Sequence, residues 1–272
     1  MHESDCTLPI GVFDSGIGGL TVLRALTEAM PRESFLYLGD TARVPYGTKS
    51  AKSVTRYALQ TTALLKARGV KLLVVACNTA TGVSLEALQE AYPDLPVVGV
   101  IRPGAQVACR SSRNGRIGVI GTESTINARG YEREILRIRP DANIFAQPCP
   151  LFVPLAEEGW CDGEIVRLVA ERYLGTLVKD TGIDTLVLGC THFPVLAEAI
   201  QSVVGPEVTL VDSARTTAEF VQDMLLRRDI CSTTTERHLT FLATDGARRF
   251  ARVGGVFLHH HLDPTDVEIV DL

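Results

Sequence analysis

An internal repeat restricts the fold of this chain more than any other feature of its sequence. The first half carries IGVFDS at residues 10–15 and LVVACNT at 73–79, and the second half carries the similar segments IGVIGT at 117–122 and LVLGCTH at 186–192. The spacing is also similar, since 66 positions separate Gly11 from Cys77 and 72 separate Gly118 from Cys190. Two matched segments at nearly matched spacing indicate two related halves.

Apolar runs of strand length alternate with segments of helical periodicity throughout the chain. We expect strands at residues 9–13, 35–38, 72–76, 117–120, 144–146, 185–188, 208–211 and 239–243. We expect helices at residues 20–30, 50–68, 85–91, 126–139, 165–179, 195–203 and 216–226, with Gly69 just past the end of the second. This alternation predicts an α/β fold of mainly parallel sheets covered by helices.

The boundary between the halves is marked only weakly. The turn-like stretch 93–103 is the best candidate for the first crossing between them. Periodicity alone leaves open whether the segment after Val208 stays with the second half or returns to the first.

Charge and composition exclude several classes of function. The 272 residues carry a net charge of -5 and contain no dense Lys/Arg cluster, so nucleic-acid binding is not indicated. The nearest group, Arg248, Arg249 and Arg252, is expected to form a solvated helical face. The N-terminus MHESDCTLPI has no basic region followed by an apolar stretch, and no apolar run reaches transmembrane length. We therefore expect a cytoplasmic protein without membrane contact.

Two of the seven cysteines are distinguished by their positions. No pair has C-x-x-C spacing, which argues against a zinc or iron–sulfur site, and the default for a cytosolic cysteine is a buried, reduced thiol. Cys77 and Cys190, however, occupy equivalent places in the repeat. Each follows an apolar strand and precedes polar residues that can begin a helix. No role beyond packing is assigned to the others, which are Cys6, Cys109, Cys149, Cys161 and Cys231.

The expected surroundings of Cys77 and Cys190 suit a reactive thiol. Ligands of open parallel sheets bind beyond the carboxyl ends of the strands. A helix N-terminus there offers free N–H groups and a positive dipole end, which lower a thiol pKa from about 8.5 toward neutrality and also hold a carboxylate. One kind of site would supply both a basic thiolate and a carboxylate anchor.

Other polar residues adjoin the same predicted strand ends. Asp14 ends the first strand, at the same sheet edge as Cys77, and the glycine run 16–19 after it lacks the spacing of a phosphate loop. We interpret those glycines as a tight turn that needs glycine backbone angles. The segment 45–47 is either an ordinary turn or part of a binding site. His192 lies two residues after Cys190, which favours a titrating role.

Four segments together resemble the signatures of bacterial glutamate racemases: GVFDSGIGGL, RVPYGTKS, VVACNTAT and LVLGCTHFP. The resemblance runs from about Pro9 to about Val211. It implies two pseudo-symmetric α/β domains with the active site in the cleft between them, comprising residues 1–98 plus 208–272 and residues 99–207. It also implies a homodimer, no cofactor and no metal.

The resemblance assigns roles to matching positions. It makes Cys77 and Cys190 the proton donor and acceptor on opposite faces of the glutamate α-carbon, with Cys77 deprotonating D-glutamate and Cys190 deprotonating L-glutamate. Asp14 and His192 would assist them. The implied substrate contacts are Asp14, Ser15, Tyr46, Gly47, Asn78, Thr79, Thr122, Thr191 and His192, and Glu157 corresponds to a position near the site.

The chemistry agrees with these residue types. Racemisation needs one group to take the α-proton and another to supply a proton from the opposite side, and a tuned thiol can do both near pH 7. The implied physiological role is the supply of D-glutamate for peptidoglycan. Two alternatives remain: a two-cysteine racemase of aspartate or a related compound, and a regulatory protein such as a topoisomerase inhibitor on this scaffold.

The repeat also predicts how the symmetry is broken. Asp14 aligns with Gly121, and His192 aligns with Thr79, so each half keeps one ionisable helper that the other lacks. We infer two unequal acid–base pairs, Asp14 with Cys77 and His192 with Cys190.

Overall fold

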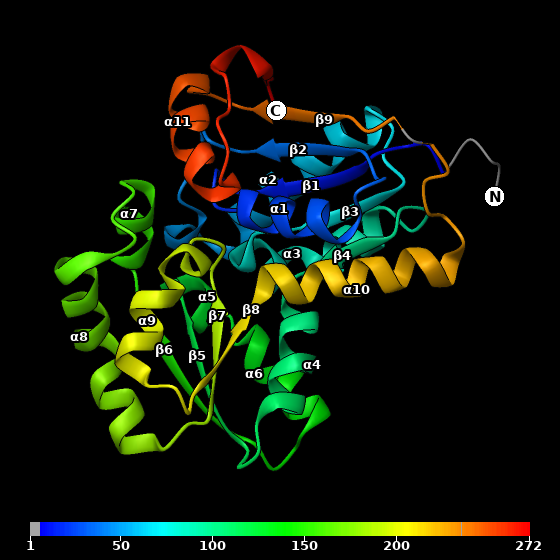
Figure 1. Cartoon of the computed structure of the whole chain (residues 1–272). Coiled ribbons are helices and arrows are strands. Elements are labelled where there is room, and N and C mark those ends of the chain that lie inside the picture. The colour runs from blue at the N-terminus through cyan, green and yellow to red at the C-terminus, as the bar shows by residue number, and fades with distance from the viewer. Residues whose placement is uncertain (1–5, 235) are drawn as a thin grey trace.

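The computed structural model describes residues 6–234 and 236–272 and contains two parallel sheets (Figure 1). The strands are β1 (Ile10–Asp14), β2 (Phe35–Gly39), β3 (Leu72–Val75), β4 (Val97–Gly99), β5 (Arg116–Gly121), β6 (Asn143–Pro148), β7 (Thr185–Gly189), β8 (Thr209–Asp212), β9 (Leu239–Ala243) and β10 (Val267–Ile269). The first sheet has the order β10-β9-β2-β1-β3-β4, and the second has the order β6-β5-β7-β8. The predicted α/β class is confirmed.

The sequence repeat has a direct counterpart in the sheets. The order β2-β1-β3-β4 in the first sheet matches β6-β5-β7-β8 in the second, so each strand of one half has an equivalent in the other. Strands β9 and β10 extend the first sheet beyond β2 and have no counterpart in the second. Because neighbouring strands in each sheet are parallel, the carboxyl ends of β1 and β3 meet at one sheet edge, and those of β5 and β7 meet at the corresponding edge of the second sheet.

Helices follow most strands and cover the sheets (Figure 1). They are α1 (Leu20–Ala29), α2 (Ala51–Ala67), α3 (Asn78–Ala91), α4 (Ile101–Ser111), α5 (Glu123–Asn127), α6 (Gly130–Ile138), α7 (Phe152–Glu157), α8 (Gly163–Thr181), α9 (Ala197–Val204), α10 (Ser213–Arg228) and α11 (Ala247–Leu258). Short 3₁₀ turns occupy Tyr46–Thr48, Phe193–Leu196 and Pro264–Asp266.

Helix α2 illustrates how the sequence sets these elements. Ser50 accepts a hydrogen bond from Ser53 N at 3.3 Å and so caps the first turn. Val54 and Leu65 lie on the apolar face of α2, which packs into the core of the first half. Gly69 follows the last turn with φ +76°, the left-handed conformation that glycine adopts without a Cβ penalty. The expected end of this helix is confirmed.

The two halves exchange their last helices. Helix α4 follows β4 of the first sheet but packs on α6 and β7 of the second half, and α10 follows β8 of the second sheet but packs on α1 of the first. Helices α4 and α10 also contact each other, and α10 crosses between the halves in Figure 1. Each of the two connections between the halves therefore includes a helix that packs on the half opposite to the strand before it.

The strand pairing differs from the expected domain division at one place. That division placed residues 208–272 together with the first half. Strand β8 instead pairs with β7 in the second sheet, because it occupies the position that β4 holds in the first. Only the later strands β9 and β10 return to the first sheet.

Some elements also differ from their expected bounds. The turn-like stretch 93–103 contains β4 and the beginning of α4, and the helix expected at 126–139 is two helices. The break between α5 and α6 falls at Arg129, whose φ of 52° is left-handed. Apolar length and periodicity do not register a single residue of this kind.

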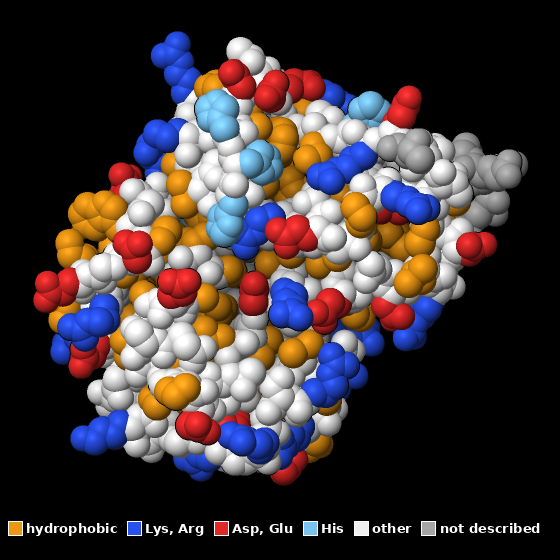
Figure 2. Space-filling model, viewed as in Figure 1, with side chains coloured by type: hydrophobic (Ala, Val, Ile, Leu, Met, Phe, Trp, Pro, Cys, Tyr) orange, Lys and Arg blue, Asp and Glu red, His pale blue; other side chains and the backbone are white. Residues whose placement is uncertain are grey.

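The surface carries charges of both signs, interspersed over the face in Figure 2. Apolar side chains are also exposed near α7 and α8, among them Leu151, Trp160, Ile165 and Leu168. Every residue of β1, β2, β3 and β7 is buried. The strand ends that carry the predicted residues therefore stand on rigid supports.

Candidate active site

A cavity of about 320 Å³ lies between the two halves, at the carboxyl ends of their central strands. It contains residues that follow β1, β3, β5 and β7. Its lining comprises Ser15, Val44, Pro45, Tyr46, Gly47, Thr48, Cys77, Asn78, Thr79, Thr122, Glu123, Thr125, Pro150, Val153, Pro154, Glu157, Cys190, Thr191 and His192. All the predicted site residues except Asp14 are thus brought together in one cavity. A larger cavity of about 540 Å³ between α3, α4, α6 and α10 contains none of them.

Cys77 is the N-cap residue of α3. Its Sγ accepts a hydrogen bond from Ala80 N at 3.4 Å, and its thiol donates to Ser15 Oγ at 3.5 Å. Burial nevertheless raises the pKa of Cys77 to about 12, and the nearby charge of Asp14 raises it further. The expected lowering of the thiol pKa toward neutrality is wrong, because desolvation outweighs the effect of the helix N-terminus. At neutral pH Cys77 is therefore a thiol.

Cys190 follows β7 but does not begin an α-helix. The chain instead enters the 3₁₀ turn Phe193–Leu196, with His192 at its N-cap position, and α9 begins only at Ala197. The Sγ atom of Cys190 lies 3.8 Å from Nδ1 of His192. The expected helix N-terminus is therefore present at Cys77 and replaced by a histidine contact at Cys190. The two thiols are near enough for Cys190 to contribute to the raised pKa of Cys77.

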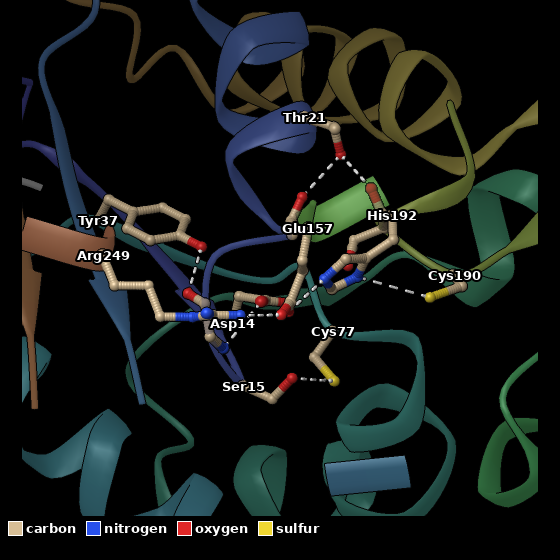
Figure 3. A network of polar contacts seen from close by, with 12 residues as sticks. Asp14, Ser15, Thr21, Tyr37, Cys77, Glu157, Cys190, His192 and Arg249 are labelled. Carbon is tan, nitrogen blue, oxygen red and sulfur yellow. Dashed lines mark hydrogen bonds and ion pairs between the residues drawn. The ribbon is translucent and has the colours of Figure 1, made fainter. Parts of the chain in front are cut away.

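His192 is buried between Cys190 and Glu157. Its Nε2 lies 3.1 Å from Glu157 Oε1, and Glu157 Oε2 accepts from Arg249 Nη2 at 2.7 Å (Figure 3). Burial alone would lower the pKa of His192, but the hydrogen bonds to Cys190 and Glu157 raise it to about 10. The hydrogen bond with His192 in turn lowers the pKa of Glu157, and Arg249 lowers it further. At neutral pH the site thus holds an imidazolium beside Cys190.

Asp14 lies behind the cavity wall. Its Oδ2 accepts from Gly16 N at 2.9 Å, whereas the buried Oδ1 has no hydrogen-bond partner among the residues that the structure describes. Burial raises the pKa of Asp14, and the charge of His192 partly opposes this effect. Asp14 therefore acts on Cys77 through its charge, while Ser15 makes the contact with the thiol. The two predicted helpers also influence each other, which separate pairs would not do.

Polar groups from both halves complete the cavity. The hydroxyl of Thr79 lies 3.1 Å from those of Thr122 and Thr125, so one hydroxyl cluster spans the two halves. Asn78 accepts from the hydroxyl of Tyr131 at 2.8 Å, and its buried Nδ2 has no hydrogen-bond partner within residues 6–234 and 236–272. The cavity is thus lined by several hydroxyls, together with the amide residue Asn78.

The segment after β2 forms another part of the wall. Tyr46 is buried and its hydroxyl donates to Asp40, whose carboxylate also accepts from Arg43 Nε at 2.7 Å. The ring of Tyr46 is therefore fixed, and its hydroxyl is already engaged. A Cβ at Gly47 would lie 3.0 Å from Cβ of Thr122, so glycine permits the close approach of the two halves here.

The glycine run after β1 has a different cause from the one expected. None of these glycines has a positive φ, so glycine backbone angles are not the reason for them. A Cβ at Gly18 would lie 2.4 Å from ring atoms of His192, and one at Gly19 would lie 2.4 Å from Cβ of Asp14. The glycines are needed for space around the two ionisable side chains.

Several residues of the site have no motif in the sequence. Arg249 belongs to the arginine group expected on a solvated face, and an ion pair between distant segments leaves no local pattern. Thr125 of α5 and Val153 of α7 line the cavity, and Tyr131 of α6 contacts the cavity residue Asn78. A threonine three residues after Thr122 is the one local signal, since it is the helix position that an N-cap contacts.

Two features are absent from the described residues, 6–234 and 236–272. They contain no cluster of three or more His, Cys, Asp or Glu side chains that could hold a metal ion. None of their helices combines the length and apolar character that crossing a membrane requires.

Comparisons with known proteins agree on one family. Residues 10–221 match the model of the Asp/Glu/hydantoin racemases. The glutamate racemase of Geobacter metallireducens is 52% identical over 250 residues, which is 92% of each chain. The structure of glutamate racemase isoform RacE1 from Bacillus anthracis superimposes with a TM-score of 0.92 at 37% identity, covering 97% of this chain and 98% of that one. The Francisella tularensis glutamate racemase, solved in complex with D-glutamate, gives 0.90 at 37% identity, with 98% of each chain covered.

Proposed function

The chain belongs to the Asp/Glu/hydantoin racemase family, and on this premise we propose that it interconverts L-glutamate and D-glutamate by proton transfer between two thiols. Relatives matched over nearly their whole length are glutamate racemases. The observation that carries the proposal is the placement of Cys77 and Cys190, which follow equivalent strands of the two halves and line one cavity. Two acid–base groups of the same kind suit a reaction whose substrate and product are mirror images.

In the direction from L- to D-glutamate, Cys190 takes the α-proton and Cys77 donates one to the opposite face. The raised pKa of Cys77 supports its role as donor, because it holds a proton at neutral pH. The imidazolium of His192 balances the negative charge of a thiolate at Cys190. After the transfer Cys190 is a thiol and Cys77 a thiolate, so the reverse reaction uses the same groups in exchanged roles.

Substrate binding is assigned to the polar lining. The unpaired Nδ2 of Asn78 and the hydroxyls of Thr79, Thr122 and Thr191 are suited to hold carboxylate oxygens. The N-terminus of α3 adds backbone N–H groups beside Cys77. A cavity of about 320 Å³ bounded by both halves would also exclude most water, which strengthens electrostatic stabilisation of the carbanion-like state.

Circular dichroism of the substrate solution tests this proposal. The purified enzyme, dialysed against a chelator and given no cofactor, should bring L-glutamate and D-glutamate to the same racemic end point. L-Aspartate serves as the specificity control and should lose its signal far more slowly. The proposal fails if glutamate stays optically pure, if a metal or cofactor must be restored, or if aspartate is the faster substrate.

On the family resemblance we further propose that the protein is cytoplasmic and supplies D-glutamate for peptidoglycan. A deletion strain without another source of D-glutamate should require it for growth, and normal growth without it would refute this role. We also propose a homodimer, for which the exposed apolar side chains near α7 and α8 offer a surface. Sedimentation that shows only monomer at micromolar concentration, with and without glutamate, would contradict it.

A further inference from the structure

Arg249 joins the two halves at the edge of the catalytic cavity. Arg249 lies in the first turn of α11, the helix that follows β9 of the first sheet. Glu157 is the last residue of α7, in the second half. Their side chains meet at 2.7 Å between Nη2 and Oε2 (Figure 3). The ion pair therefore crosses from one half to the other and ends on a residue that lines the cavity.

Glu157 divides its two oxygens between two partners. Oε2 is held by Arg249, and Oε1 is held by Nε2 of His192 at 3.1 Å. The other ring nitrogen of His192 then faces Cys190 Sγ at 3.8 Å. The chain of contacts runs from Arg249, whose side chain is 52% exposed, through Glu157 at 18% to His192 at 8%. It connects solvent to one of the two thiols.

We propose that Arg249 is a positioning residue that fixes the carboxylate of Glu157 and thereby aims the ring of His192 at Cys190. This inference rests on the proposed function, because it assigns Arg249 to the arm that serves Cys190. An isolated exposed ion pair contributes little to stability, so its place in this chain of contacts is what gives the Arg249–Glu157 pair a role.

A second cavity explains why Glu157 needs to be held. About 160 Å³ of space lies on the outer side of Glu157, lined also by Gly16, Asp245, Arg249 and Phe250. Glu157 borders both this space and the catalytic cavity. Without Arg249 the carboxylate has room to turn outward, although Asp245 would repel it there. The charged groups around Glu157 are thus His192, Arg249 and Asp245, and Asp14 acts on His192 from the first half.

The chain offers a matched control on the same helix. Arg248 is exposed beside Arg249, and its side chain forms no hydrogen bond or ion pair with residues 6–234 and 236–272. Arg248→Gln therefore removes the same charge at nearly the same place without touching Glu157. Arg249→Lys tests rescue, because the contact with Glu157 uses a single nitrogen and a flexible ammonium can replace it.

The experiment compares Arg249→Gln, Arg249→Lys and Arg248→Gln with the wild-type enzyme, after circular dichroism has shown that each is folded. Arg249→Gln should lower kcat/KM for glutamate by about 10- to 100-fold, the range expected for a misplaced catalytic group. The loss must be equal in both directions, because the equilibrium constant does not change. Arg249→Lys should recover most of the activity, and Arg248→Gln should stay within about twofold of wild type.

Two further readouts separate positioning from a structural effect. The primary isotope effect with α-deuterated L-glutamate should rise in Arg249→Gln, since Cys190 removes that proton, and the effect with α-deuterated D-glutamate should not. The acid limb of kcat/KM should move to higher pH, because the pKa of Glu157 loses one of the interactions that lower it, and ionised Glu157 is required. Both should be unchanged in Arg248→Gln.

The inference is overturned if Arg249→Gln and Arg248→Gln have the same kcat/KM. It is also overturned if Arg249→Gln loses activity without rescue by lysine and with unaltered isotope effects and pH profile. A larger isotope effect on D-glutamate alone would overturn the assignment to Cys190. Failure of the proposed function is distinguishable from all of these, because the wild-type enzyme would then not racemise glutamate.

Discussion

Sγ of Cys190 lies 3.8 Å from Nδ1 of His192, and both residues lie in the short segment between the end of β7 and the 3₁₀ turn that begins at Phe193. Cys77 has no such partner, and its thiol contacts the hydroxyl of Ser15 instead. The two halves share a strand order but surround their cysteines differently, with a carboxylate charge behind Cys77 and an imidazolium beside Cys190. Because of this asymmetry, Cys77 holds a proton at neutral pH, whereas Cys190 has a positive charge beside it that balances a thiolate.

The first prediction concerns the charge of His192. With a pKa raised to about 10, His192 stays protonated throughout the neutral range and loses its proton only near pH 10. Because the pKa is raised on folding, its contribution to stability is complete below the unfolded value of about 6.5 and disappears as pH rises through 10. NMR titration of labelled histidine measures this, and Glu157→Gln should lower the value. His259, whose pKa is lowered, serves as an internal reference. A neutral His192 at pH 7.5 would contradict the prediction.

The second prediction concerns Tyr131. Its hydroxyl donates to Oδ1 of Asn78, a residue that lines the cavity, and so fixes the orientation of the Asn78 amide. Tyr131→Phe removes about 1 kcal/mol of orienting interaction and should raise KM for glutamate by about fivefold with a smaller effect on kcat. Tyr92→Phe is the control, since that hydroxyl contacts Leu59 O at 3.2 Å and does not line this cavity. Equal KM values for the two variants would refute the role of Tyr131.

The third prediction concerns the space around His192. Gly18→Ala places a methyl group where the ring now lies, at 2.4 Å, and must displace either the ring or the loop. We expect kcat to fall by about 100-fold while the protein remains folded. Gly175→Ala in α8 meets only a side-chain carbon at 3.7 Å, so it should leave kcat unchanged. Steady-state kinetics decide the matter, and an active Gly18→Ala enzyme would show that the close packing is not required.

The fourth prediction concerns stability away from the site. Lys71 and Glu33 form a buried ion pair at 2.6 Å, with side chains 2% and 5% exposed. Lys71→Met leaves the carboxylate of Glu33 buried without its partner and should cost about 3–5 kcal/mol in urea unfolding. Arg215→Met breaks the exposed pair with Glu219 and should cost less than about 1 kcal/mol. Similar losses in the two variants would contradict the importance of burial.

The sequence predicted the residues that lie in recognisable motifs and missed residues whose only link to the site is a contact between distant segments. Cys77 and Cys190 were found because each follows an apolar strand in an equivalent segment, and the shared strand order confirms that the halves are related. Arg249 and Tyr131 were missed because their partners, Glu157 and Asn78, lie far away in the sequence. Such contacts depend on how the halves pack, and neither periodicity nor composition records that packing.

The thiol pKa of Cys77 was mispredicted for a similar reason. The sequence correctly indicates that Cys77 lies at the N-terminus of α3, and the helix dipole there does favour a thiolate. Desolvation depends on everything that covers the thiol, including the opposite half, and it exceeds the local effect. Local motifs therefore indicate which residue carries the chemistry, whereas its protonation state requires the whole structure.

The central claim is that two thiols act on opposite faces of the α-carbon, and the fate of deuterium from solvent tests it most directly. L-Glutamate is incubated with the enzyme in D₂O, and both enantiomers are separated at low conversion and analysed by mass spectrometry. A thiol carries a single proton, so Cys190 returns the proton it has taken, while Cys77 donates from a pool that has exchanged with solvent. We predict that the newly formed D-glutamate carries α-deuterium and that the recovered L-glutamate retains protium. D-Glutamate that retains the original proton would show a single base serving both faces and would contradict the account.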